Sequence, residues 1–556
     1  MSGDYVSESP VVAASRPAEW NFADVWSTIA TSTPAALAQC GASVSSTWRD
    51  FDGRSSSLAL AMLGTGVTTD DTVGIYLYNG PHYMETAFAC FKARVQPVNI
   101  NYRYGADELR YLWRDADLRA LVFHGCFSGI VDSLRDEFPG VRTWIHVEDG
   151  TSPCPEWATP YQGLAAATDG TGALPTRAGA DRLLIYTGGT TGRPKGVVWR
   201  QHDLYRASDT ARDPETANLE AVRARVLQTD RAKPVGLSAA PLMHGTGFVF
   251  AMSILSRGGC LVTQSSRRFD VFELLDLLTR FRVSALCIVG EAFCLPMVEA
   301  LEAEPDRWDL TSLEAVSSAG MVWRAETKQR LLVFAPNAVL VDLLNSSEAS
   351  GLARSVTSRT REAPTGRFQL GANAFVIDER GEEIVAGSGE VGRLVVGGHL
   401  PLGYHNDPEK SAATFPVLRG MRCSVPGDLA RVESDGTITL LGRASSVINR
   451  GGEKIFAEEV EEALRRHRAV RDVVVVGIAH DRLGEDVAAV VELIDGTSAD
   501  VDEIASCARE TLASYKVPRT IVIVDSVVRS PSGKVDYQDA KAKLAEWLRT
   551  DSAKER

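Results

Sequence analysis

The sequence lacks the features that define several large classes of protein. It has no apolar run approaching the roughly 18 residues that a membrane-spanning helix needs, so no membrane span is expected. It also has no excess of basic residues, because 59 lysines and arginines face 72 acidic residues and give a formal net charge of −13. Nucleic-acid binding depends on basic surfaces, so this balance argues against a nucleic-acid partner.

Paired cysteines and a leader segment are missing as well. The nine cysteines are scattered and none forms a C-x-x-C pair, so we expect reduced thiols in a cytoplasmic protein, most of them small buried apolar residues. Residues 1–19 carry an early acid and no continuous apolar segment. We therefore expect a flexible N-terminal arm there, rather than a signal peptide or a membrane anchor.

Strand-like and helix-like segments alternate through most of the chain, which at 556 residues is too long for one hydrophobic core. Residues 72–79 and 119–125 are apolar and rich in β-formers, whereas residues 106–117 and 269–281 have helical spacing. Strands that alternate with helices favour parallel sheets covered on both faces. We predict an α/β fold, with a large N-terminal domain of parallel-rich αβα sheets over residues 20–443.

The pattern changes near residue 366. Turn signals at Glu379-Arg380-Gly381 and at Asp435-Gly436 separate strand-like runs, which predicts a β-barrel-like subdomain over about 366–443. The short polar segment ASSVINRGG then ends in two glycines, Gly451 and Gly452, and predicts a hinge linker over residues 444–450. Residues 451–556 alternate helices and strands over a length typical of an independent unit, so we predict a small, mobile α+β C-terminal lid domain.

A loop rich in glycine and threonine follows the strand-like run RLLIYT and ends in Pro194-Lys195-Gly196. Its glycines let successive backbone N–H groups face inward, while the threonine hydroxyls and Lys195 add donors and a charge, so together they can surround a polyphosphate. The residues concerned are Thr187, Gly188, Gly189, Thr190, Thr191, Gly192 and Lys195. The loop is not a Walker A motif, because Pro194 precedes the lysine.

The loop resembles the T-S-G-T-T-G-x-P-K-G signature of the adenylate-forming superfamily, with glycine in place of serine at position 188. That family covers acyl-CoA synthetases, peptide-synthetase adenylation domains and beetle luciferases. Further segments resemble the family in the same order and extend the resemblance over residues 20–545: PLMHGTGF, SSAGM, LNSSEAS, VPGD, LGR, RGGEK and SPSGK.

The resemblance implies a set of nucleotide- and adenylate-binding residues. They are Thr187, Gly188, Gly189, Thr190, Thr191, Lys195, Ser318, Ala319, Gly320, Leu344, Asn345, Ser346, Ser347, Asp428 and Arg443. It also implies four catalytic residues: Lys195; His244 at the acyl and pantetheine entrance; Glu348 as the Mg²⁺ ligand; and Lys534, which engages the acyl carboxylate and the phosphate. In this scheme Ser347 meets the α-phosphate and Asp428 binds the ribose hydroxyls.

The second half of such a reaction implies further sites. The CoA channel would be lined by Arg450, Gly451, Gly452, Glu453 and Lys454 after the C-terminal domain has rotated about a hinge at Ser445. The acyl pocket would be lined by His244, Gly245, Phe248, Ser317 and Met321, several of them small, which favours a bulky apolar acid. The chain resembles bacterial CoA ligases of fatty, steroid or terpenoid acids, and no carrier-domain signature follows Lys534, which favours free CoA.

Two departures from the family pattern leave alternatives open. Leu344 stands where an aromatic residue usually stacks on adenine, and Asn345 stands where glycine is usual. The expected function is an acyl-CoA ligase that uses ATP (bound as acyl-AMP), Mg²⁺ and coenzyme A. One alternative is an enzyme that performs mainly the thioester step on a preformed acyl-adenylate. Weaker alternatives are an inactive binding homologue and a luciferase-like oxygenase, and a homodimer stays open.

Overall fold

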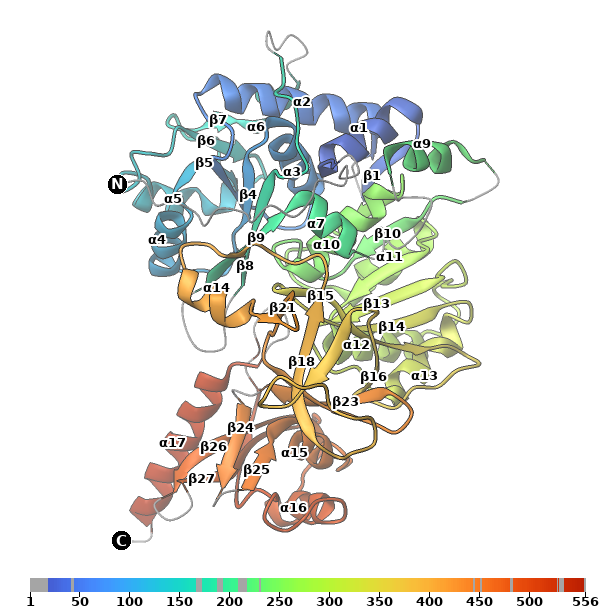
Figure 1. The fold of residues 1–556 in the computed structure, drawn as a ribbon, viewed down its shortest axis with the longest axis vertical. Coiled ribbons are helices and arrows are strands. Elements are labelled where there is room, and N and C mark those ends of the chain that lie inside the picture. Colours follow the sequence, from blue (N-terminus) through green and yellow to red (C-terminus); the bar gives the residue numbers. More distant parts are fainter. Residues whose placement is uncertain are drawn as a thin grey trace.

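The computed structural model describes most of the chain, in segments separated by short gaps. These segments are residues 19–41, 45–166, 173–187, 194–208, 218–229, 232–443, 446–450, 453–480, 484–527, 529 and 535–554. They form two large sheets covered by helices and a smaller C-terminal unit, which Figure 1 shows in orange and red at the bottom.

The first large sheet carries the strand that leads into the glycine-rich loop. Its strands, in spatial order, are β19 (Gly403–Tyr404), β9 (Lys195–Arg200), β8 (Arg182–Thr187), β4 (Gln96–Asn99), β3 (Thr72–Tyr76), β5 (Leu118–His124), β6 (Thr143–Val147) and β7 (Thr159–Pro160). The strands from β8 to β7 are paired in parallel. β9 and β19, at one side of the sheet, are paired antiparallel.

Both faces of this sheet are buried, as parallel strands require. Successive residues of β5 point to opposite faces: Val122 belongs to the core formed with α2 and α3, and Leu121 and Phe123 belong to the core formed with α4 and α5. The helices around this sheet are α1 (Phe22–Ser32), α2 (Trp48–Gly64), α3 (Pro81–Ala93), α4 (Ala106–Asp115), α5 (Ser128–Arg135), α6 (Tyr161–Ala166), α7 (Gln201–Ala207) and α9 (Leu219–Leu227). The helix expected over residues 106–117 is thus confirmed.

The second large sheet changes from parallel to antiparallel along its length. Its strands, in spatial order, are β2 (Ser45–Thr47), β1 (Leu37–Gly41), β11 (Cys260–Thr263), β10 (Val235–Ser238), β12 (Ala285–Ile288), β13 (Ala315–Ala319), β14 (Val339–Ser346), β15 (Ala349–Thr357), β16 (Arg367–Leu370), β23 (Thr437–Arg443), β22 (Asp428–Val432), β18 (Val391–Gly397), β21 (Met421–Ser424) and β20 (Val417–Leu418), with β17 (Ala374–Ile377) paired to β18. From β1 to β14 the pairing is parallel, and the β14–β15 hairpin reverses it.

The helices of this half are α10 (Gly245–Ser256), α11 (Val271–Arg280), α12 (Gly290–Ala303), α13 (Ala325–Phe334) and α14 (Pro408–Thr414). The segment expected to be antiparallel does consist of antiparallel strands, and the predicted turn at Asp435-Gly436 joins β22 to β23. These strands are hydrogen-bonded to the parallel part of the sheet through β15 and β16. The predicted α/β class is therefore confirmed.

The C-terminal unit has a sheet and cores of its own. Its elements are β24 (Val447–Arg450), β25 (Glu453–Phe456), α15 (Ala457–Leu464), β26 (Val470–His480), β27 (Gly484–Leu493), α16 (Val501–Arg509), β28 (Thr520–Val524) and α17 (Tyr537–Lys554). Glu461 of α15 and Arg465, the residue that follows this helix, are four positions apart and form an ion pair of 3.0 Å. Helices and strands alternate as the sequence predicts.

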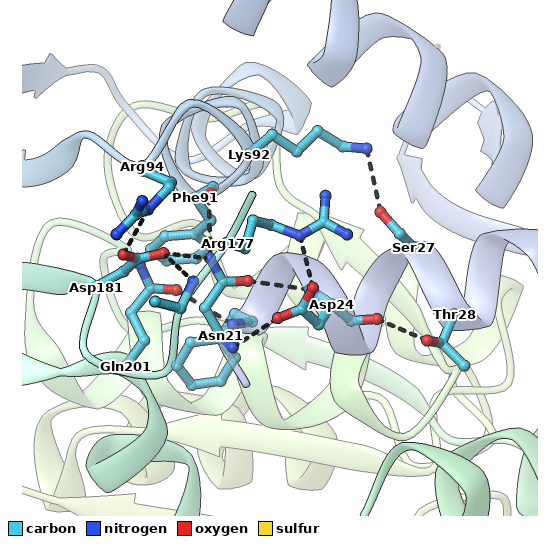
Figure 2. A network of polar contacts seen from close by, with 12 residues as sticks. Asn21, Asp24, Ser27, Thr28, Phe91, Lys92, Arg94, Arg177, Asp181 and Gln201 are labelled. Atoms are coloured by element: carbon cyan, nitrogen blue, oxygen red, sulfur yellow. Dashed lines mark hydrogen bonds and ion pairs between the residues drawn. The ribbon is translucent and has the colours of Figure 1, made fainter. Parts of the chain in front are cut away.

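A polar network fixes the first helix to the strand that leads into the glycine-rich loop (Figure 2). Asn21 caps α1 in a reciprocal pair with Asp24, and its Nδ2 donates to the Phe91 carbonyl and to Asp181 Oδ2 at 3.1 and 3.0 Å. Asp181 also accepts from Arg94 Nε at 2.9 Å, and it precedes β8 directly. Because the Asn21 and Asp181 side chains are buried and bonded, they hold the base of β8 in place.

Two expectations from composition concern cysteines and membranes. All nine cysteines are free thiols, and the Cys40 and Cys260 Sγ atoms lie 3.1 Å apart. Within the described segments, every helix is too short or too polar to span a bilayer.

Candidate active site

The ends of the glycine-rich loop face each other across the β8–β9 hairpin. Thr187 is paired with Lys195 in the antiparallel register, so the residues on either side of the loop lie side by side at one end of this strand pair. Gly188, Gly189, Thr190 and Thr191 lie outside the described residues. Thr187 and Lys195 both line a cavity that is described below.

Lys195 is held by a segment more than two hundred residues away. Its Nζ lies 2.5 Å from Asp407 Oδ2 and 5.9 Å from the centre of the Tyr404 ring. The Lys195 ammonium lowers the pKa of the Asp407 carboxyl below its ordinary value. Asp407 also caps α14 by accepting from the Lys410 backbone N–H. The contact therefore presents a cation at the end of β9 in a fixed position.

The turn of the β14–β15 hairpin brings Ser347 and Glu348 beside β9. Trp199 Nε1 donates to the Ser347 carbonyl at 2.9 Å, and the Tyr404 hydroxyl donates to Glu348 Oε1 at 2.8 Å. Burial, together with the charge of Glu348, raises the pKa of Tyr404 above its ordinary value, so this hydroxyl stays protonated near neutral pH. Tyr404 thus contacts Glu348 through its hydroxyl, and Lys195 lies over its ring.

The side chain of Asn345, which stands where the family usually has glycine, forms a hydrogen bond within the β14–β15 hairpin. Its Oδ1 accepts from the Gly351 backbone N–H at 2.7 Å, where the register between Leu344 and Ser346 shifts. The side chain therefore bonds the next strand. Leu344 packs partly against the core of the antiparallel strands and lines the cavity beside Lys195 with an aliphatic surface.

Two cavities meet at these segments. The larger has a volume of about 1290 Å³ and the smaller about 770 Å³. Both are lined by the ends of β8, β13 and β14 and by the start of α17, and the shared residues include Thr187, Gly320, Asn345, Ser346, Ser347, Val535 and Tyr537. A molecule placed at this junction contacts the glycine-rich hairpin and the β14–β15 turn at once.

The two cavities differ in chemistry. The smaller is lined by many charged residues, including Lys195, Glu348, Asp428, Arg443 and Asp342. The walls of the larger cavity are mostly apolar or small, as described further below. The smaller cavity therefore suits a polar, charged group and the larger an apolar one.

Asp428 and Arg443 face each other at the start of the β22–β23 hairpin. They are register partners, and Arg443 Nε lies 3.5 Å from Asp428 Oδ1. Asp342 also lines this cavity, and its Oδ2 lies 3.4 Å from Lys328 Nζ, with both side chains buried. Burial raises the pKa of Asp342 to about 6, an effect that the Lys328 charge partly offsets. The predicted pair Asp428 and Arg443 thus reaches the charged cavity.

The residues predicted for the acyl pocket do not all line one cavity. His244 is the N-terminal cap residue of α10, and it lines the larger cavity together with Gly245 and Ser317. Phe248 is instead buried in the core, edge-on to Tyr83 with ring centres 5.9 Å apart. The reason is the helical period, which turns Phe248 away while Val249 and Phe250 face the cavity. Met321 lines the smaller cavity.

The predicted residues of β13 also reach the junction. Ser318, Ala319 and Gly320 line the larger cavity, and Gly320 lines both. Ser318 Oγ accepts from the Gly290 backbone N–H at 2.8 Å, which ties the end of β13 to the start of α12. The carboxyl end of this parallel strand therefore forms part of the site, where ligands of such sheets usually bind.

The C-terminal unit contributes residues near Lys534 to the junction. Lys534 itself lies outside the described residues, but Val535, the next residue, and Tyr537 line both cavities. Arg450 lines neither of the two cavities. Its Nε lies 2.6 Å from Asp486 Oδ1, and its Nη1 donates to the Tyr515 carbonyl at 3.3 Å. In this arrangement the start of α17 faces the cavities and the β24–β25 end does not.

For the other predicted residues of the CoA channel and the hinge, the structure gives only a backbone position or none. Glu453 and Lys454 lie on β25, paired with Arg450 and Asn449. Gly451, Gly452 and Ser445 lie outside the described residues. Sequence reasoning missed Tyr404, Asp407 and Trp199, because their contacts join segments far apart in the chain. The only local signal was Asp407 before Pro408, a typical helix start.

A buried carboxyl group lies at the junction between β23 and the C-terminal unit. Glu458 on α15 packs against Gly442, whose φ of +95° and lack of a side chain both suit this contact. Its Oε1 lies 3.4 Å from Ser446 Oγ, and among the described residues Oε2 has no hydrogen-bond partner. Burial, with a smaller contribution from the charge of Glu461, raises the pKa of Glu458 to about 7.

Replacing Glu458 by glutamine is expected to remove a pH-dependent destabilisation. The folded pKa of about 7 exceeds the ordinary value of 4.5, so the folded state holds the proton more tightly. Wild-type stability should therefore fall as the pH rises from about 4.5 to about 7, by about 1–3 kcal/mol. Thermal unfolding should show Glu458→Gln to be more stable than wild type near pH 8 but not near pH 5. The exposed Glu462→Gln is the control, and a difference independent of pH would contradict the assignment.

Comparison with known proteins agrees with this geometry. Residues 26–405 match the family of AMP-binding enzymes, and residues 459–534 match the AMP-binding enzyme C-terminal domain. The chain is 38% identical over 476 residues to the medium-chain acyl-CoA ligase Mig of Mycobacterium avium, covering 85% of this chain and 86% of the relative. It is 36% identical over 516 residues to the 3-oxocholest-4-en-26-oate–CoA ligase of Rhodococcus rhodochrous, covering 91% and 92%.

The fold is also similar to that of a solved ligase. The crystal structure of the anthranilate CoA ligase AuaEII in complex with anthranoyl-AMP matches with a TM-score of 0.81 at 21% identity, covering 97% of this chain and all of that one. The family match spans more than half of the sequence, and the two relatives exceed 30% identity over most of it. The chain therefore belongs to the AMP-binding, or adenylate-forming, enzyme superfamily, and within it to the acid–thiol ligases of the AMP-forming acyl-CoA synthetase type.

Proposed function

We propose that this protein activates a bulky hydrophobic carboxylic acid as an acyl-adenylate, using ATP and Mg²⁺, and then transfers the acyl group to coenzyme A. The observation that supports this most is the junction of an apolar and a charged cavity at Thr187, Ser346 and Ser347. An acyl-adenylate has one apolar and one charged half, and its mixed anhydride would lie at that junction.

In the first step an oxygen of the substrate carboxylate attacks the α-phosphorus of ATP, and the bond to pyrophosphate breaks. Negative charge builds up on the phosphate oxygens, so cations and N–H donors fixed in advance lower the barrier. Lys195 is such a cation, held by Asp407 at the end of β9. The residues next to Lys534 line both cavities, which suits a lysine that bridges carboxylate and phosphate.

The residues at the junction fit a magnesium ion bound largely through the nucleotide. Among the described residues, no cluster of three or more His, Cys, Asp or Glu side chains could hold a metal alone. Glu348 offers one carboxylate beside Ser347, with Oε1 oriented by Tyr404. One or two carboxylates plus substrate phosphates is the usual environment of Mg²⁺ in nucleotide sites. The ion would neutralise phosphate charge, and Glu348 would be its protein ligand.

In the second step the thiol of CoA attacks the acyl carbon, and the bond between that carbon and the AMP oxygen breaks. His244 lies at the start of α10 on the wall of the larger cavity, which places it near the acyl end of the junction. Arg450, Glu453 and Lys454 would take part only after the C-terminal unit, which begins with β24, has rotated about a hinge at Ser445. The arrangement described here, with Val535 and Tyr537 at the cavities, suits adenylation.

The size of the acid follows from the larger cavity. Small side chains on β12 and β13, including Ala285, Ala315 and Ser317, hollow out one face of the sheet beneath α10. The cavity volume of about 1290 Å³ exceeds what most small ligands require. The relatives are named for medium-chain acyl groups and for a steroid acid, and we propose substrates of these two kinds.

Acid-dependent exchange of pyrophosphate into ATP tests the proposal. We expect exchange with medium-chain or sterol-derived acids in the presence of Mg²⁺, and mass spectrometry should detect both acyl-AMP and, after addition of CoA, acyl-CoA. Leu344 provides no aromatic face for adenine, so the thioester-only alternative is kept as a defined outcome. Absence of exchange together with CoA capture of a supplied acyl-adenylate would favour that alternative, and absence of both reactions would refute the proposal.

A further inference from the structure

The larger cavity follows one face of α10 along its whole length. The lining residues Gly245, Val249, Phe250, Ser253 and Arg257 recur at helical spacing. Twelve residue steps at 1.5 Å each separate Gly245 from Arg257, or about 18 Å. The cavity therefore extends far from the anhydride position, and Arg257 lies at the remote end of this face.

The wall opposite α10 is formed by strands that run along the same axis of the cavity. β11 follows α10 directly and runs parallel to β10 and β12, so the C-terminal end of α10 lies beside the starts of these strands. Ala285 and Ala315, the first residues of β12 and β13, line the cavity there, whereas Ala319 and Gly320 line it at the other edge of the sheet. The reacting centre and Arg257 thus lie at opposite edges of one sheet.

The Arg257 side chain has an unusual environment for an arginine. Its Nε is enclosed and has no hydrogen-bond partner, and none of the ion pairs among the described residues includes it. Arg257 follows α10 directly, but no side-chain hydrogen bond joins it to the last carbonyls of the helix, and only its backbone N–H bonds to the helix. Arg257 as a whole is partly exposed, but burying its Nε–H without an acceptor is costly.

We propose that Arg257 recognises an oxygen-bearing group at the end of the acyl chain or ring system that is remote from the reacting carboxyl. A guanidinium offers several N–H donors in a planar fork that suits a carbonyl or a carboxylate oxygen. The cavity around it is otherwise formed by small and apolar residues such as Ala285, Ile254 and Ala315. Arg257 thus makes the site selective for a hydrophobic acid that carries a distal oxygen, an inference that depends on the proposed function.

Matched pairs of acids test this assignment in the full-length protein. One set comprises hexadecanoic acid, its ω-hydroxy form and the α,ω-dicarboxylic acid of the same length. The other set is a sterol-derived acid with a ring ketone remote from the carboxyl, and its deoxy counterpart. We expect wild type to favour the oxygenated member of a pair by about 10- to 100-fold in kcat/KM, since a hydrogen bond to a charged group has that strength. The comparison of ketone, hydroxyl and carboxylate identifies which oxygen is preferred.

Arg257→Met should abolish this preference while changing kcat/KM for the unsubstituted acids less than about threefold. The loss should appear in KM, because a contact remote from the reacting atoms is made equally in the ground and transition states. Arg257→Lys, which keeps the charge but not the fork, should retain part of the preference and serves if the methionine variant does not fold. Arg282→Met, an exposed arginine after α11, is the matched control.

Two results would overturn the assignment: no preference in wild type, or a preference that survives in Arg257→Met. A merely structural role would lower activity with all acids alike and leave the ratio within each pair unchanged. If wild type activates none of the acids, the proposed function fails, and calorimetric binding of the same pairs to wild type and Arg257→Met then decides the role of Arg257 alone. Equal binding to both proteins would contradict it.

Discussion

Replacing Lys534 by alanine is expected to lower the rate of acyl-adenylate formation about 100- to 1,000-fold, the loss typical of a donor removed from developing charge. The residues that follow it, Val535 and Tyr537, line both cavities at the junction. A lysine there would hold two anions together, the acyl carboxylate and the α-phosphate, which otherwise repel each other. Pyrophosphate exchange measures this step directly.

Measuring the thioester step by itself distinguishes a role of Lys534 in adenylation from a general loss of activity. We expect CoA capture of a supplied acyl-adenylate to change less than about tenfold in Lys534→Ala, because the lysine acts while the phosphate bond breaks. Lys543→Ala on α17 removes the same charge from the same unit at a partly exposed ion pair with Asp539, and it should leave both steps intact. Equal losses in both half-reactions would show that position 534 does not act in adenylation.

Replacing Glu348 by glutamine is expected to reduce adenylation by a similar factor, about 100- to 1,000-fold, and to raise the Mg²⁺ concentration needed for half-maximal exchange. Glutamine has the same shape and can still accept from the Tyr404 hydroxyl, so the hairpin turn should keep its geometry. What is lost is the negative charge that would bind the ion. Exchange rates over a series of Mg²⁺ concentrations measure the effect.

Tyr404→Phe provides the matched comparison for Glu348. It removes the 2.8 Å hydrogen bond but keeps the carboxylate and the ring beneath Lys195. We expect a loss of about tenfold or less, since a single neutral donor contributes modestly. If Tyr404→Phe proved as damaging as Glu348→Gln, the tyrosine would itself contact the nucleotide. A Mg²⁺ dependence unchanged in Glu348→Gln would exclude the carboxylate as a metal ligand.

The sequence predicted those parts of the fold that depend on local patterns. Apolar runs rich in β-formers identified β3 and β5, and helical spacing identified α4 and α11, the two helices to within two residues at each end. The turn at Asp435-Gly436 followed from the turn preference of these residues. These signals are local, because burial on both faces gives a strand a continuous apolar run, and burial on one face gives a helix its spacing of apolar residues.

For the candidate site, the sequence motifs named several residues that line the cavities and one that does not. Motif order alone indicated Thr187, Lys195, Glu348 and Asp428, and all four line the charged cavity. Phe248 was assigned to the acyl pocket together with His244 and Gly245, but its side chain is buried in the core while the adjacent Val249 and Phe250 line the cavity. Side-chain direction depends on where a helix begins, and sequence patterns locate helix ends poorly.

Other residues could not be found because their partners are distant in the chain. Asp407 contacts Lys195 across 212 positions, and Trp199 reaches the Ser347 carbonyl across 148. Arg257 was invisible for a different reason, since a single arginine after an apolar helix is an ordinary helix end in sequence. Only the cavity beside it gives the residue a possible role.

The pairing of β19 with β9 limits how the protein can be divided into fragments. Gly403 and Tyr404 lie opposite Val198 and Val197, and the flanking Leu402 and His405 N–H groups donate to β9. A segment that follows most of the second sheet thus completes the edge of the first. A truncated chain ending before residue 403 would leave the backbone of β9 open and apolar, and such exposed strands aggregate. The AMP-binding match ends at residue 405, just past this strand. Soluble expression of the larger part alone should therefore require β19.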